Sequence, residues 1–187
     1  MTTVPRAAST PPGDAVGGVD WSQWTVILLK PDCLARNLTG PVLAMASEHV
    51  RVTAERIVYP TEEQVFAHYA DILPLSAELG VDVPAELRRM YLGHPIMVAL
   101  GQGANAAARL RAVLGPTDPA EAGADTIRGQ FGTDTLRKAR SEGRLIANLI
   151  HSSDHAGVVA RDLAVLFGSG ATALLTPVSP NPGGSSR

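Results

Sequence analysis

Short apolar runs alternate with amphipathic stretches along the middle of this chain. Runs with the length of buried strands occur at residues 24–29, 51–59, 95–100 and 145–150. Helical patterns occur between and after them, at residues 40–50, 61–72, 104–114 and 155–167, with an irregular or helical stretch up to Gly93. This order, βαββαβ with extra segments, predicts a ferredoxin-like α+β sandwich in which helices cover one face of an antiparallel four-stranded sheet.

The two ends of the chain lack this patterning. Residues 1–20 and 168–187 are rich in small residues and proline and offer little to bury. Such composition predicts disordered tails on either side of one folded domain at residues 21–167.

Composition narrows the class of protein. With 187 residues and 45% hydrophobic content, the chain can form one substantial core. A net charge of −2 argues against a broad basic surface for nucleic acid. The absence of an apolar signal region or a membrane-length run predicts a soluble cytoplasmic protein with no membrane partner. The single cysteine, Cys33, excludes an internal disulfide and a multi-cysteine zinc site.

His151 stands where two patterns meet. The apolar run at residues 145–150 ends just before it, and Ser152, Ser153 and Asp154 are residue types that begin helices. We therefore expect the imidazole at the end of a strand beside a helix N-terminus, where an anion such as phosphate is favoured. A structural histidine is the alternative.

Asp162 interrupts the apolar stripe of the last helix. It lies four residues from Val158 and four from Leu166, so it falls on the face predicted to be buried. A buried carboxylate needs a partner, and His151 is the candidate, because a carboxylate that fixes one ring nitrogen leaves the other free for chemistry. The alternative is a carboxylate at the edge of the stripe that reaches water.

Lys30 directly follows the first strand, which Pro31 should end. A lysine in this position is usually solvated, but it gains interest beside other phosphate-binding groups. Candidates from separate elements are Arg111, Thr117, Arg128 and Asn148, each of which could also be an ordinary surface residue.

Three familiar motifs do not apply. Residues 101–106 match GxGxxA, but no second parallel strand with an acidic end follows, so these glycines are interpreted as a turn. The sequence HSSDH at residues 151–155 resembles an inverted zincin motif with Asp in place of Glu, and the expected helix cap within it argues against a metal site. No GxxxxGK[ST] phosphate loop occurs.

Taken together, the motifs resemble those of the nucleoside diphosphate kinase family, from about Thr25 to Phe167. The pieces that carry the resemblance are Lys30-Pro31-Asp32, His68-Tyr69, Thr117-Asp118-Pro119-Ala120, Thr126-Ile127-Arg128-Gly129 and Asn148-Leu149-Ile150-His151-Ser152-Ser153-Asp154. The resemblance implies the ferredoxin-like fold. It also implies transfer of a terminal phosphate from a nucleoside triphosphate to a diphosphate through a phosphohistidine, with Mg²⁺ accompanying the nucleotide and a homo-oligomeric state.

The resemblance also assigns residues to roles. His151 matches the nucleophile, and Asp162 matches the carboxylate that orients it, although its side chain is one methylene shorter. The remaining matches are Lys30 and Tyr69 near the transferred phosphate, Ser153 near the histidine, Arg111, Thr117 and Arg128 as phosphate binders, and Asn148 at the ribose. No residue is assigned as a direct metal ligand.

Departures from the family pattern leave the acceptor open. Residues 70–90 contain no aromatic to stack on a base, and residues 135–144 form a basic helical insertion expected either to border the phosphate pocket or to be a solvated surface helix. Ser152 and His155 replace a usual glycine and serine. The alternatives are a specialised kinase for a modified nucleotide or other small acceptor, and a nucleotide-binding regulatory module with little turnover.

Overall fold

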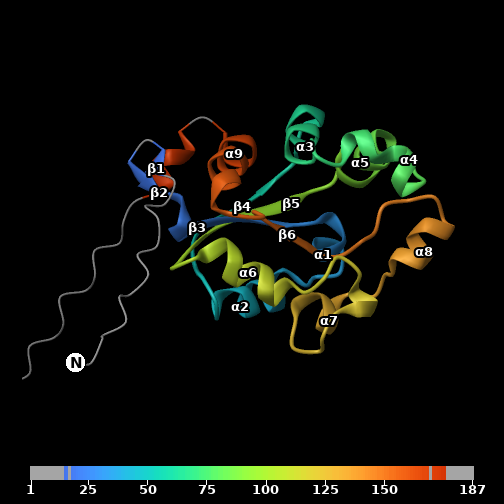
Figure 1. Ribbon diagram of the computed structural model, residues 1–187, viewed down its shortest axis with the longest axis horizontal. Helices are drawn as coiled ribbons and strands as arrows, with labels where there is room; N and C mark the ends of the chain where they lie inside the picture. Colours follow the sequence, from blue (N-terminus) through green and yellow to red (C-terminus); the bar gives the residue numbers. More distant parts are fainter. Residues whose placement is uncertain (1–14, 17, 169, 176–187) are drawn as a thin grey trace, which may run out of the picture.

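A four-stranded antiparallel sheet forms the centre of the protein. The computed structural model describes residues 15–16, 18–168 and 170–175. The strands are β3 (Trp24–Leu29), β4 (Arg51–Val58), β5 (Ile96–Gln102) and β6 (Ile150–Ser152), in the spatial order β4-β5-β3-β6. All neighbours pair antiparallel, which confirms the predicted ferredoxin-like α+β fold (Figure 1).

Helices cover both faces of the sheet, so the prediction that they cover one face is wrong. On one face lie α3 (Glu62–His68), α5 (Val83–Tyr91) and α9 (Ala156–Phe167); on the other lie α1 (Pro31–Ala35), α2 (Thr39–Ser47), α6 (Ala106–Leu114) and α7 (Ile127–Phe131). Val26 and Leu28 of β3 pack into the first core, whereas Ile27 and Leu29 pack into the second. The unbroken apolar run of β3 is typical of a strand whose two faces are both buried.

Helix α3 begins where the sequence predicts and ends earlier than predicted. Thr61 and Gln64 form a reciprocal capping box at its N-terminus. The helix ends at His68, four residues before the predicted end, and the chain continues through the 3₁₀ helix η2 (Leu73–Leu75) and α4 (Ser76–Leu79) into α5. His68 and Tyr69 therefore lie at the C-terminal end of α3, close to the sheet.

The last strand is displaced from its predicted position at residues 145–150. Leu149 has a φ of 70°, and its N–H donates to Asp32 Oδ2 at 3.0 Å. This left-handed residue breaks the extended run, so that β6 begins at Ile150 and His151 lies inside the strand. The cap of α9 is also different, because His155 Nδ1 accepts from Gly157 N in place of the predicted Ser152, Ser153 or Asp154.

The predicted insertion contains a short helix, and the ends carry further small elements. Helix α8 (Leu136–Ser141) follows the 3₁₀ helix η3 (Pro119–Glu121) and α7. Part of the predicted tails is ordered: β1 (Ala15–Val16) pairs with β2 (Val19–Asp20), η1 (Trp21–Gln23) follows, and η4 (Ala171–Leu174) lies after α9. Residues 1–14, 17, 169 and 176–187 of the predicted tails lie outside the described residues. No helix in the described part has the length and apolar character needed to cross a membrane.

Candidate active site

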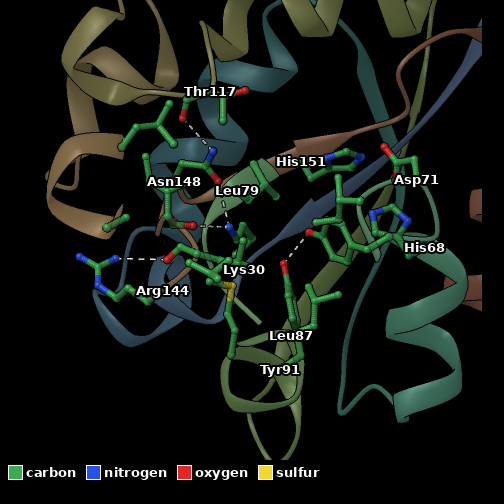
Figure 2. Close-up of a pocket in the computed structure, with 18 of the residues that line it drawn as sticks. Lys30, His68, Asp71, Leu79, Leu87, Tyr91, Thr117, Arg144, Asn148 and His151 are labelled. Atoms are coloured by element: carbon green, nitrogen blue, oxygen red, sulfur yellow. Dashed lines mark hydrogen bonds between the residues drawn. The ribbon is translucent and has the colours of Figure 1, made fainter. Parts of the chain in front are cut away.

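A cavity of about 260 Å³ lies between the sheet, α5 and α8. Polar side chains from five separate segments meet at one end of it, namely Lys30, His68, Tyr69, Thr117, Arg128, Asn148 and His151. Figure 2 shows His68 and His151 at one side of this end and Lys30 with Asn148 at the other. The fold thus brings together most of the residues that the sequence singled out.

His151 reaches this cavity because of its strand register. It pairs with Leu28, so its side chain lies on the sheet face covered by α3, α5 and α9. The ring makes edge contacts with His68 at 4.7 Å and Tyr69 at 5.8 Å between centroids. Burial, and then the neighbouring His68, lower the pKa of His151 to about 3. The imidazole is therefore neutral near pH 7, which a nucleophile requires.

Asp162 is buried as predicted from the apolar stripe, with 1% of its surface exposed. Its contacts differ from the expected one. Ser153 Oγ donates to Asp162 Oδ2 at 2.8 Å, and His68 Nδ1 lies 3.5 Å from Asp162 Oδ1. Burial alone would raise the pKa of this carboxyl, but His68, Ser153 and Arg161 hold it below its usual value.

The predicted direct contact between Asp162 and the His151 ring is replaced by a contact through His68. The His68 ring packs edge-on against His151 and lies within 3.5 Å of the carboxylate. Sequence reasoning quoted His68 within the His68-Tyr69 pair and gave it no role. Its position beside Tyr69 was the signal that could have identified it.

Lys30 and Asn148 form a buried hydrogen-bonded pair on one side of the cavity. Lys30 Nζ donates to Asn148 Oδ1 and to the Ile146 carbonyl, both at 3.0 Å. Asn148 Nδ2 donates in turn to the Thr117 carbonyl at 2.9 Å. Burial lowers the pKa of Lys30 to about 8. The ammonium group is therefore held in place at the polar end and is mainly charged at neutral pH.

The two predicted phosphate-binding arginines are engaged within the protein. Arg128 donates to the backbone carbonyls of Asn148, Gly115 and Ile150, at 3.3, 2.9 and 2.7 Å. It lines the cavity, and its guanidinium braces the chain on both sides of Leu149. Arg111 forms an ion pair with Asp154, with both side chains about half exposed, and does not line the cavity.

A close approach of the backbone sets the position of Arg128. Gly129 follows it in α7, where a Cβ atom would lie 1.9 Å from the Gly123 carbonyl oxygen. Only glycine permits this packing of the 115–126 segment on α7 without movement of the backbone. Thr126 caps the same helix by accepting from Gly129 N.

The other half of the cavity is an aliphatic chamber between α4, α5 and α8. It is lined by Ile72, Leu79, Val81, Leu87, Met90, Leu136, Ala139, Leu145 and Ile146. Arg144 joins the insertion to the body of the protein through a paired contact with Asp134, with Nη2 2.8 Å from Oδ1. Glu86 of α5 also accepts from Leu145 N at 3.2 Å. The insertion thus borders the cavity through the apolar Leu136 and Ala139 and the basic Arg140 and Arg144.

Known proteins resemble this chain in both sequence and fold. The family model described as "Nucleoside diphosphate kinase" matches residues 23–171. A nucleoside diphosphate kinase of Pyrobaculum aerophilum is 30% identical over 171 residues, covering 76% of this chain and 93% of its own. That of Methylobacterium sp. (strain 4-46) is 35% identical over 146 residues, covering 76% and 91%. A Borrelia burgdorferi structure, described as a transition state mimic with bound vanadate and ADP, has a TM-score of 0.71 at 25% identity, covering 80% of this chain and 89% of that one.

Proposed function

Because the chain belongs to the nucleoside diphosphate kinase family, we propose that it moves the terminal phosphate of a nucleoside triphosphate to a nucleoside diphosphate through phosphorylated His151. One observation carries the assignment to this residue. His151 is a neutral imidazole on the wall of the cavity, opposite the buried Lys30–Asn148 pair. A nucleophile and a fixed cation therefore face the same space.

The transfer divides into two similar steps. A ring nitrogen of His151 forms a bond to the terminal phosphorus while the bond to the bridging oxygen breaks, and the nucleoside diphosphate leaves with that electron pair. A terminal oxygen of a second diphosphate then takes the phosphoryl group, and the electron pair of the broken P–N bond returns to the imidazole. Lys30 supplies positive charge beside the phosphates, where alignment and neutralisation of charge drive phosphoryl transfer.

His68 and Asp162 position the nucleophile in this proposal. His68 Nδ1 lies 3.5 Å from Asp162 Oδ1, and the His68 ring makes an edge contact with the ring of His151. The carboxylate therefore acts on His151 through a second ring, while Ser153 fixes its other oxygen. Restricting the imidazole in this way reduces the orientational freedom that the reaction must otherwise overcome.

Mg²⁺ is the ion we propose to accompany the nucleotide. Within the described ranges, no group of three or more His, Cys, Asp or Glu side chains is arranged to hold a metal ion. Mg²⁺ commonly uses phosphate oxygens, waters and one or two carboxylates, and Asp154 is a carboxylate on the cavity wall. When bound, the ion supplies neutralisation of phosphate charge.

A second candidate is a specialised kinase for a modified nucleotide or another small phosphorylated acceptor. The aliphatic chamber favours it, because side chains such as Leu87, Met90 and Ala139 offer shape and apolar surface without hydrogen bonds to the edge of a base. An acceptor panel containing unmodified and alkyl-substituted nucleoside diphosphates separates the two candidates. Faster transfer to the alkylated members would favour the specialised kinase.

Homo-oligomerisation and a cytoplasmic location complete the proposal. Ile57 of edge strand β4 and Tyr59, which follows this strand, are 60% and 67% exposed, which supports a contact between copies of the chain. Light scattering coupled to size-exclusion chromatography tests homo-oligomerisation, and a monomer at micromolar concentration would contradict it. Cell fractionation tests the cytoplasmic location.

Labelling with γ-³²P-ATP and Mg²⁺ tests the central assignment. We expect a protein-bound phosphate that is labile in acid and stable in alkali, and that passes to added nucleoside diphosphate. His151→Ala should remove it, whereas His94→Gln, at an exposed position, should label normally. Labelling of His151→Ala at the wild-type level would show that another residue carries the phosphate.

A further inference from the structure

Tyr91 places a second hydroxyl at the polar end of the cavity. It is the last residue of α5, and its hydroxyl oxygen lies 2.5 Å from that of Tyr69. Both residues line the cavity, and their rings are tilted by 40° with centroids 5.5 Å apart. Figure 2 shows the Tyr91 hydroxyl directed from α5 toward the oxygen to which it is hydrogen-bonded. The pair connects α5 with the end of α3.

Burial decides which hydroxyl donates. Tyr91 is 1% exposed, and within the described residues its hydroxyl has no other hydrogen bond. If Tyr69 donated, the Tyr91 hydrogen would be a buried donor without an acceptor, which carries the full penalty of desolvation. Donation from Tyr91 to Tyr69 avoids that penalty. It leaves the hydrogen of the part-buried Tyr69 free to point into the cavity.

The Tyr69 ring lies close to the imidazole proposed to react. Its ring centroid is 5.8 Å from that of His151. A hydroxyl that accepts one hydrogen bond while donating another is polarised and becomes a stronger donor, above all to an anionic phosphate oxygen. Burial raises the pKa of Tyr69, so the phenol keeps its hydrogen at neutral pH.

We propose that Tyr91 is a positioning residue, which donates its hydroxyl hydrogen to Tyr69 and so holds Tyr69 as a donor to the phosphoryl group that passes to His151. The inference rests on the proposed phosphohistidine function. Neither tyrosine gains or loses a proton in the step: the P–N bond to His151 forms as the P–O bond of the nucleotide breaks. The role of Tyr91 therefore depends entirely on Tyr69.

A double-mutant cycle tests that dependence. Single-turnover phosphorylation of His151 is measured for the wild type, Tyr91→Phe, Tyr69→Phe and the double variant. Tyr91→Phe keeps the buried ring and should lower the rate by roughly five- to tenfold, the range expected for one well-placed hydrogen bond. In the Tyr69→Phe background the same change should have no further effect. His94→Gln, at an exposed position outside the cavity lining, is the control and should leave the rate unchanged.

A binding measurement separates positioning from a general loss of structure. Tyr91→Phe should bind ADP as the wild type does and should bind ADP with vanadate, which mimics the transferring phosphoryl group, more weakly. Tyr91→Met gives a second variant without the hydroxyl. An equal loss of rate in both Tyr69 backgrounds, or an equal loss of ADP affinity, would overturn the inference.

The controls also separate this inference from the proposed function. A wild-type protein that takes no label would remove the phosphohistidine function itself, and the role of Tyr91 with it. A wild-type protein that labels on His151, together with Tyr91→Phe labelling at the same rate, would remove only the role of Tyr91.

Discussion

The pKa of His151 makes the stability of the fold depend on pH in a calculable way. In the unfolded chain this imidazole takes up a proton near its ordinary pKa of 6.5, whereas burial in the folded protein lowers that pKa to about 3. Between these two values the unfolded state binds a proton that the folded state does not. The free energy of unfolding should therefore fall as the pH falls below about 6.5, and this contribution should be constant above about 7.5.

The size of the effect follows from linkage. Each pH unit between the two pKa values changes the free energy of unfolding by about 1.4 kcal/mol. Lowering the pH from 7.5 to 5 should thus remove about 2 kcal/mol through His151 alone. Such a loss is a large fraction of the stability of an ordinary domain, and it lies above the pH range where most carboxylates titrate.

Urea unfolding followed by tryptophan fluorescence measures the loss, because Trp21 and Trp24 are buried in the core. Wild type, His151→Gln and the exposed control His94→Gln are compared at several pH values and one protein concentration. His151→Gln should remove most of the acid slope, and His94→Gln should keep it. A slope that is unchanged in His151→Gln would refute the reasoning, because the proton uptake would then belong to other groups.

Three further predictions concern the surroundings of His151. The pKa of Lys30 is lowered to about 8, so the ammonium charge is lost as the pH rises through about 8 and phosphorylation of His151 should slow. A rate of phosphorylation that stays constant up to pH 9.5 would contradict this. Asp134→Asn should lower the free energy of unfolding by about 1–3 kcal/mol in urea, because it removes the negative charge and one of the two acceptor oxygens that Arg144 contacts. Glu142→Gln should cost under about 1 kcal/mol, and equal costs would argue against the role of Asp134. Ala139→Leu should narrow the aliphatic chamber and raise the KM for nucleotides more than it lowers kcat, as steady-state kinetics would show.

The sequence predicts the elements of this fold better than it predicts their long-range contacts. The apolar run of β3 indicates a buried strand, and its lack of alternation was the signal that both of its faces are covered. The start of β6 could not be derived in the same way. Leucine is not a residue type that favours a positive φ, and the turn at Leu149 is fixed by Asp32, far away in the chain.

Burial of Asp162 could be predicted from its place in a helical stripe, whereas its partner could not. The contact with His68 joins two helices that are distant in sequence, and a helical pattern gives no information about which helix lies opposite. Tyr91 lies directly after residues 70–90, so the lack of an aromatic residue in that segment gives no information about it. The catalytic role of His151 stays a prediction.

The ion pair with Asp154 gives Arg111 a counter-ion within the protein. A phosphate group that recruits Arg111 must first displace this carboxylate, and both side chains are about half exposed. Exposed pairs of this kind contribute only about 0.2–1 kcal/mol, so the carboxylate is a weak competitor. We expect this competition to rank ligands by charge: a polyphosphate should displace Asp154 from Arg111 readily, whereas a singly charged anion should gain little by replacing one carboxylate with another. Added salt should reduce the differences in affinity between ligands of different charge, because it screens both the incoming ligand and the carboxylate of Asp154.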